Sequence, residues 1–310
     1  MGFPALLQTS LAGLDLRNPV IAAAGTCGYI DELADAMGLD RIGAITTKSI
    51  TLEPRDGNRA VRVVPSRAGM LNAIGLANMG VDRFLAEEAP KVRHCPTTVI
   101  ASVAGHTLAE YASVSSSIDR CGSLRAIELN VSCPNTATGR QFGSEPSTLR
   151  ELLNEVRPVV KSCVLSVKLA PDMTDPVAMA SAAIDGGANV LVLCNTMPAM
   201  AIDVHSRRPR LSRTMGGLSG PAIHPIIVRI VREVYSRVAR DAGIPIVAVG
   251  GVMGWEDAAE FILAGATAVG VGTALFVDPS SPVRIARGLE RWATAQGVTK
   301  ISQLVGQVEA

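Results

Sequence analysis

Eight short apolar runs recur along the 310-residue chain, and a stretch with helical periodicity follows each of them. The runs are rich in Val, Ile, Leu and Ala, a composition typical of buried parallel strands. A strict alternation of strand and helix indicates parallel strands joined by crossover connections. We predict the strands over 20–24, 44–47, 98–103, 126–131, 164–168, 190–194, 245–249 and 268–271.

The helices are predicted near 31–37, 81–91, 108–119, from about Ser147, 176–184, 223–241, 255–263 and 282–295. Eight strand–helix units in a chain of this length favour an α/β fold, a closed (β/α)8 TIM barrel that forms a single domain over 1–310. A doubly wound open sheet is the alternative, but the even spacing of the units favours the barrel. No compositional boundary splits off a second domain.

The composition excludes several classes of protein. A formal net charge of +1 and only 3% aromatic residues argue against a nucleic-acid partner. The six Cys are scattered without a Cys-x-x-Cys pair, so we expect no metal site, iron–sulfur site or disulfide framework. Residues 1–18 do not read as a signal peptide, and no run of about 20 apolar residues predicts a membrane span. We therefore expect a cytoplasmic protein that does not bind membranes.

Two amides and a thiol gather at the end of the fourth predicted strand, as Asn130, Cys133 and Asn135. The carboxyl ends of parallel strands are where such folds place ligands. Asn offers a paired donor and acceptor that suit a flat amide-rich ring, and Cys can transfer a proton. Taken alone, a Cys is more often a small buried hydrophobe. The other strand ends favour the functional interpretation.

Lys48 and Lys168 each end an apolar run, and a cation at the mouth of a barrel is usually matched to an anion. The alternative is a side chain that extends to solvent at a strand edge. The seventh and eighth strands end in Gly250-Gly251 and Gly272-Thr273, which with Ser219-Gly220 predict a phosphate pocket. A dinucleotide fingerprint is absent. The four His show no metal or triad spacing, and we assign them to the surface or to loops.

A set of motifs resembles the dihydroorotate dehydrogenase family over about 14–276. Each motif is short, but their combination and order are specific. They are Lys48, Asn72-Ala73-Ile74-Gly75-Leu76, Asn130-Val131-Ser132-Cys133-Pro134-Asn135, Lys168-Leu169, Asn195-Thr196, Gly217-Leu218-Ser219-Gly220-Pro221-Ala222, Gly250-Gly251 and Gly272-Thr273.

The resemblance implies an FMN-binding barrel that oxidises dihydroorotate to orotate in pyrimidine (UMP) biosynthesis. It makes Cys133 the catalytic base for the C5 proton, with Lys48 and Lys168 as catalytic cations. The implied substrate-binding residues are Lys48, Asn72, Ala73, Ile74, Gly75, Leu76, Asn130, Asn135, Asn195 and Thr196. The implied FMN-binding residues are Ala24, Gly25, Lys48, Ser49, Ser102, Asn130, Lys168, Cys194, Gly220, Gly250, Gly251, Gly272 and Thr273.

A Cys base separates the chain from the membrane-bound, quinone-using type, which uses Ser. The sequence Asn-Ala-Ile-Gly-Leu over 72–76 is similar to the NAD-linked type, whose catalytic subunit forms a homodimer and pairs with an FAD/[2Fe–2S] subunit. A fumarate-linked dihydroorotate dehydrogenase and an FMN-dependent dihydropyrimidine dehydrogenase are the alternatives among enzymes. A barrel that binds flavin without turnover is the alternative from another class, and Cys133 argues against it.

The chain departs from the family pattern at four places. Ala24 replaces a usual Ser, Ser102 a usual Asn, and Asp172 a common Asn. We expect the first two changes to weaken individual hydrogen bonds to FMN, each worth roughly 0.5–1.5 kcal/mol. The lid over 136–142 is one residue shorter than usual and carries Arg140 near its second Gly position, which bears on loop closure and substrate choice.

Overall fold

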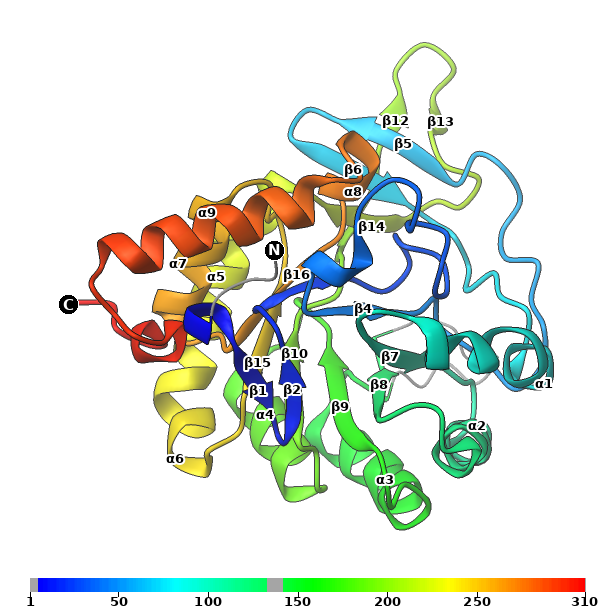
Figure 1. Cartoon of the computed structure of the whole chain (residues 1–310). Coiled ribbons are helices and arrows are strands. Elements are labelled where there is room, and N and C mark those ends of the chain that lie inside the picture. The colour runs from blue at the N-terminus through cyan, green and yellow to red at the C-terminus, as the bar shows by residue number, and fades with distance from the viewer. Residues whose placement is uncertain (1–4, 133–141, 310) are drawn as a thin grey trace.

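Eight parallel strands close into a barrel at the centre of the molecule (Figure 1). The structure is a computed structural model that describes residues 5–132 and 142–309. Around the barrel the strand order is β10-β15-β16-β3-β4-β7-β8-β9, which confirms the predicted (β/α)8 fold. The strands are β3 (Val20–Ala22), β4 (Ala44–Thr46), β7 (Thr98–Val103), β8 (Ala126–Asn130), β9 (Val164–Leu169), β10 (Val190–Leu193), β15 (Ile246–Val249) and β16 (Ala268–Val271).

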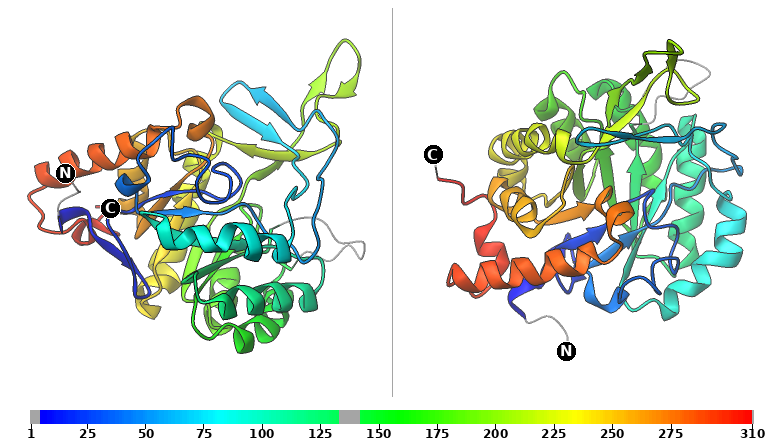
Figure 2. Two further views of the ribbon diagram at one scale, coloured as in Figure 1. Left: turned by 45° about the vertical axis from the view of Figure 1, so that its right-hand side comes forward. Right: turned by 90° about the horizontal axis from the view of Figure 1, so that it is seen from above.

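Helices surround the barrel, as the view from above in Figure 2 shows. The longer ones are α2 (Leu108–Cys121), α3 (Pro146–Val156), α4 (Pro176–Asp185), α5 (His224–Val234), α7 (Trp255–Ala264) and α9 (Ser281–Ala295). Shorter ones are α1 (Val81–Arg83), which continues through helical turns to His94, α6 (Arg240–Ala242) and α8 (Ala274–Val277). Side chains cap the starts of α2 and α4: the Thr107 hydroxyl accepts the Glu110 N–H, and the Asp175 carboxylate accepts the N–H groups of Val177 and Ala178.

The helix predicted over 31–37 is wrong. This segment forms turns, and only a short 3-10 helix follows, Leu39–Arg41. The carboxylate of Glu32 accepts the backbone N–H groups of Tyr29 and Ile30 at 2.9–3.0 Å, which holds the chain in a turn. The first strand of the barrel is therefore followed by turns rather than by an α-helix, unlike the predicted pattern.

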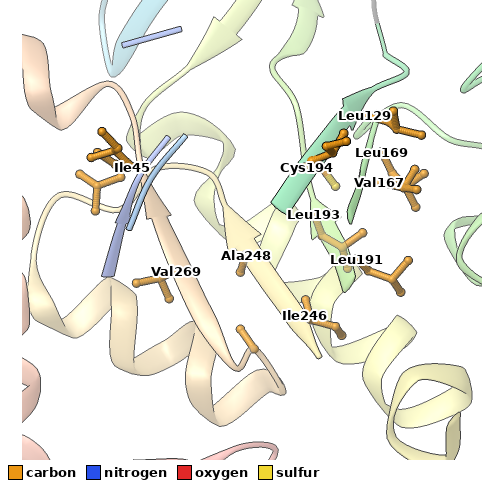
Figure 3. Close-up of a cluster of buried hydrophobic side chains, with 14 of the residues drawn as sticks. Ile45, Leu129, Val167, Leu169, Leu191, Leu193, Cys194, Ile246, Ala248 and Val269 are labelled. Atoms are coloured by element: carbon orange, nitrogen blue, oxygen red, sulfur yellow. The ribbon is translucent and has the colours of Figure 1, made fainter. Parts of the chain in front are cut away.

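Every strand of the barrel alternates between two cores. In β10, Leu191 and Leu193 face outward and pack with Ile246 and Ala248 in the core between barrel and helices (Figure 3). Val190 and Val192 instead belong to the cluster inside the barrel. An N-terminal hairpin, β1 (Thr9–Leu11) and β2 (Leu14–Leu16), contributes Leu11, Leu14 and Leu16 to this inner cluster. The barrel interior is thus filled at one end and not a pore.

A four-stranded antiparallel sheet lies beside the carboxyl ends of the barrel strands, in the upper part of Figure 1. We call it the roof sheet: β5 (Val63–Ser66), β6 (Gly69–Asn72), β11 (Met197–Ala199) and β14 (Gly216–Ser219), in the order β11-β14-β6-β5. A hairpin of β12 (Ile202–Asp203) and β13 (Arg208–Pro209) extends from it. Neither contributing segment lies within the predicted strands and helices. No helix within the described ranges is long and apolar enough to cross a membrane.

Candidate active site

A cavity of about 600 Å³ lies between the barrel mouth and the roof sheet. Its volume falls in the range of small-molecule and cofactor sites. Nineteen predicted site residues line it: Ala24, Gly25, Lys48, Ser49, Asn72, Ala73, Ile74, Gly75, Leu76, Asn130, Lys168, Cys194, Asn195, Thr196, Gly220, Gly250, Gly251, Gly272 and Thr273. Cys133 and Asn135 lie outside the described residues, although Ser132, directly before them, lines the cavity.

Ser102 is the one described site residue that does not line the cavity. It is fully buried in β7, and its Oγ lies 2.9 Å from the Oγ of Ser49. Ser49 in turn accepts a hydrogen bond of 3.1 Å from the amide of Asn130. Ser102 therefore lies behind the lining and supports it through Ser49. Because its side chain does not face the cavity, the position does not support the predicted direct contact with the cofactor.

The amides at the ends of β8 and β10 form one hydrogen-bonded network. Asn195 Nδ2 donates to Asn130 Oδ1 at 3.0 Å, and Thr196 N donates to Asn195 Oδ1 at 2.8 Å. The Tyr111 hydroxyl donates to the Asn130 carbonyl at 2.7 Å and fixes the end of β8. Opposite them, Asn72 Nδ2 donates to Gly217 O at 3.3 Å within the roof sheet. These contacts give the amides defined orientations toward a flat polar ring.

The two predicted cations lie in different surroundings. Lys168 is only 6% exposed, and its Nζ lies 3.8 Å from Oε1 of the buried Glu128. Burial raises the pKa of Glu128, while the neighbouring Lys168 opposes that rise. Lys48 is half-buried, and burial, with a smaller contribution from Arg62, lowers its pKa. A weakly hydrated cation in each position is suited to an anionic ligand group.

Glu128 is not among the predicted site residues, although the strand pattern contained the signal. Side chains two residues apart share a face of a strand, so Glu128 shares the inner face of β8 with Asn130. Asn58, Met70, Met215 and Phe276 were not predicted either, and they line the cavity from segments outside the predicted strands and helices. No local pattern marks these four residues.

Glycines line the side of the cavity formed by β15 and β16. Gly251 has φ +71°, and a Cβ there would lie 2.8 Å from Gly220 O, so a side chain is excluded. At Gly272 the nearest atoms to a Cβ lie at 3.8 Å, which leaves the backbone open to a ligand. Thr273 Oγ1 donates to Ser219 Oγ at 2.8 Å beside it. This open backbone surface fits a phosphate or another oxyanion.

His224 lies behind the turn at Gly250-Gly251. This position is contrary to the prediction that all four His lie on the surface or in loops. It is buried at the start of α5, with Nδ1 at 2.8 Å from Gly250 O and Nε2 at 3.0 Å from Glu260 Oε2.

The thiol of Cys194 is also buried, which raises its pKa and leaves it a packing group in the lining of the cavity. Among the described residues no cluster of His, Cys, Asp or Glu is arranged to hold a metal ion.

Comparison with known proteins matches the chain over residues 6–292 to the family model described as dihydroorotate dehydrogenase. A relative from Pelobacter propionicus is 45% identical over 304 residues, 98% of each chain. Relatives from Geotalea daltonii and Geotalea uraniireducens are each 44% identical, over 98% and 99% of both chains. All three bear the name dihydroorotate dehydrogenase B (NAD(+)), catalytic subunit.

Proposed function

Because the chain belongs to the dihydroorotate dehydrogenase family, we propose that it oxidises (S)-dihydroorotate to orotate in pyrimidine (UMP) biosynthesis, with FMN as the hydride acceptor. The observation that carries this proposal is the joint placement of amides, a buried cation and open glycine turns around one cavity. Amides suit the pyrimidine ring, the cation suits an electron-accepting ring, and the turns suit a phosphate. The proposal covers the chain from 1 to 310 and places the reaction in the cytoplasm.

On the substrate side, Asn72, Asn130, Asn135 and Asn195 hold the pyrimidine ring, with Thr196 beside them. The network between Asn130 and Asn195 orients two of these amides before substrate arrives. Lys48 pairs with the substrate's carboxylate, and the segment Ala73–Leu76 adds contacts from the end of the roof sheet. Cys133 takes the proton from C5 as a thiolate, the form in which a Cys acts as a base.

On the cofactor side, FMN when bound supplies the acceptor for the C6 hydride. Gly220, Gly250, Gly251, Gly272 and Thr273 hold its phosphate end, and the free space at Gly272 fits that role. Lys168 lies against the ring and stabilises negative charge there, since a cation in a closed site is poorly screened by water. Ala24, Gly25, Ser49 and Cys194 complete the lining, and Ser102 acts through Ser49.

For the electron acceptor we propose NAD, reached through a second subunit that carries FAD and a [2Fe–2S] cluster. The names of the relatives, an NAD(+) enzyme and a catalytic subunit, support this assignment. A homodimer of this chain forms the core of the complex. Fumarate as the acceptor, and a dihydropyrimidine without the carboxylate as the substrate, are the alternatives.

The test combines chromophore identity with reduction. Denaturing the purified chain should release FMN, and anaerobic dihydroorotate should bleach the bound flavin. The chain alone should reduce NAD slowly, and adding the flavin/iron–sulfur subunit should restore turnover. Released FAD would refute the cofactor assignment, and faster bleaching by dihydrouracil than by dihydroorotate would refute the substrate. Efficient turnover with fumarate would replace the NAD assignment.

A further inference from the structure

A small second cavity, of about 20 Å³, lies inside the barrel beneath the first. Three residues line both cavities, Ala23, Lys168 and Val249, so Lys168 forms part of the boundary between them. Most of the lining of the small cavity is apolar, but Thr46, Glu128 and Ser166 also contribute. Its volume is enough for one water molecule when polar partners are available.

The side chain of Glu128 provides such a partner. The residue is 5% exposed, and its Oε1 has no hydrogen-bond partner among the described residues. The nearest cation, Lys168 Nζ, lies 3.8 Å from that oxygen, which is beyond the length of a direct hydrogen bond. A buried carboxylate oxygen left without a donor is costly, so a bridging group is expected in this gap.

We propose that Glu128 is a positioning residue for Lys168: one buried water bridges its carboxylate to the ammonium group and holds that group at the floor of the active-site cavity. The water accepts a hydrogen bond from Lys168 Nζ and donates to Glu128 Oε1. The proposal deepens the proposed function, because the purpose of Lys168 there is to face the flavin ring.

The charges explain why such a residue is needed. The oxidised ring system is neutral and offers no counter-charge to a buried ammonium group, and an unpaired buried charge is strongly destabilising. The carboxylate of Glu128 supplies that counter-charge before the hydride arrives. It also offsets part of the field of Lys168 at the ring, so it limits how strongly the reduced, anionic ring is favoured.

Infrared spectroscopy of the flavin-free protein tests the pair itself. The wild type should lack a protonated-carboxyl carbonyl band that depends on Glu128. Lys168→Met removes the cation that opposes the effect of burial on Glu128, so it should gain this band, and the double variant Lys168→Met/Glu128→Gln should lose it again. A Glu128-dependent band in the wild type, or no band in folded Lys168→Met, would overturn the proposal. Lys168→Gln repeats the test if Lys168→Met does not fold.

A double-mutant cycle on the flavin midpoint potential tests the direction of the effect. Glu128→Gln should favour the reduced flavin by about tenfold, which corresponds to about 30 mV for a two-electron couple. In the Lys168→Met background the same substitution should have less than a third of that effect. Thr46→Val, which changes the same small cavity without changing charge, should leave the potential unaltered. Equal shifts of the potential in both backgrounds would refute a role of Glu128 that acts through Lys168.

The two measurements separate this inference from the proposed function. If the chain binds no flavin, the infrared experiment still decides whether Glu128 and Lys168 form an ion pair. If dihydroorotate reduces the flavin normally but the cycle finds no coupling, the proposed function stands and the positioning role fails.

Discussion

Two groups of neighbouring strands on the inner wall of the barrel have opposite chemistry, and we refer to them as the polar half and the apolar half. Strands β8 and β9, the polar half, place Glu128, Asn130, Ser166 and Lys168 on their inner faces. Strands β10, β15 and β16, the apolar half, instead fill the interior with residues such as Val190, Val192, Val247 and Ala268. Both parts have the same parallel pairing and the same alternation of side chains. The fold alone therefore does not decide where polar groups enter the core.

The difference in polarity between the two halves follows from which groups lie at the carboxyl ends of their strands. The polar half ends in amides and a cation whose side chains act on a ligand, and those side chains need polar partners below them. In the apolar half, β15 and β16 end in Gly250-Gly251 and Gly272-Thr273, where the backbone faces the ligand, and only β10 is followed by an amide side chain, that of Asn195. Backbone groups need no side-chain support, so the strands below can pack as an ordinary core. We expect substitutions in the polar half to alter reaction rate and those at the glycine turns to alter cofactor retention.

The largest effect is expected at Cys133, which follows the polar half in sequence. Cys133→Ser should retain FMN and orotate but slow flavin reduction by dihydroorotate by roughly 10²–10⁴-fold, the usual contribution of a positioned base. A free thiol titrates near about 8.5 and a hydroxyl far higher, so the rate should recover partly at high pH. Rapid-mixing measurements of flavin bleaching across pH test this.

Two further variants complete that experiment. Cys133→Ala should show the loss without the recovery at high pH. Cys121→Ser, at the half-buried end of α2, should reduce its flavin at the wild-type rate. Wild-type rates in flavin-loaded Cys133→Ala would mean that the base lies elsewhere.

Gly272→Ala, at the end of the apolar half, should weaken FMN binding, whereas Cys133→Ser should retain FMN and slow its reduction. A Cβ there meets no protein atom closer than 3.8 Å, so the melting temperature should stay unchanged. The methyl group would occupy the surface assigned to the phosphate and should weaken FMN binding by roughly 10–100-fold. Flavin titration of the apoprotein measures this. Gly243→Ala, a turn far from the cavity with no atom within 4 Å of a Cβ, should leave the affinity unchanged. Unaltered affinity in Gly272→Ala would remove this turn from the cofactor site.

Val192→Thr tests whether the apolar half tolerates a polar group. The side chain is 2% exposed and belongs to the apolar cluster inside the barrel, so the variant buries a hydroxyl on the apolar side of the small cavity, where the wild type has no polar group. We expect a loss of about 1–3 kcal/mol in the free energy of unfolding, measured by urea denaturation. Val204→Thr, at a residue that is 77% exposed, should change this free energy by less than about 0.5 kcal/mol. A neutral effect of Val192→Thr would show that the two halves differ less than their composition indicates.

The smallest effect concerns Asp119, which anchors the entry to β9 in the polar half. Its carboxylate accepts the backbone N–H groups of Lys161, Ser162 and Cys163 at 2.8–3.1 Å. Burial alone would raise the pKa of Asp119, but these three donors lower it below its usual value. A lowered pKa adds stability that is full above the unfolded value of about 3.9 and is lost as pH falls through the folded value.

Asp119→Asn should therefore lower the free energy of unfolding by about 1–2 kcal/mol at neutral pH. The difference from the wild type should shrink as pH falls below about 4, because the wild-type carboxylate then takes up a proton. Urea denaturation at several pH values measures it, with Asp241→Asn, an exposed side chain, as the control. A difference that stays constant to the lowest pH would contradict a role for the ionised carboxylate.

The barrel was largely predictable because its strands are continuous apolar runs. The bounds of β7 and β16 match the predictions, and every bound of the other six barrel strands lies within two residues of its predicted position. The part of the cavity lining that lies at the strand ends was also predictable, since the carboxyl ends of parallel strands converge, whereas Asn72–Leu76 were expected only from the family resemblance. The helix over 31–37 failed because Glu32 bonds to the backbone of a turn. The roof sheet was missed because its strands are short, contain Gly and Pro, and pair across a long stretch of sequence.

That long-range pairing has a consequence for how the molecule opens. Asn72 and Gly217, joined within the roof sheet, are 145 positions apart. Joining such distant segments has a large entropic cost until the intervening barrel strands have brought them together, so the roof is expected to form late in folding. The backbone N–H groups of the roof sheet should exchange with solvent hydrogen through local opening. Those of the barrel strands should exchange only through global unfolding. The roof sheet, which lines one side of the cavity, would then be a cooperative unit of its own, whose stability can be altered without altering that of the barrel.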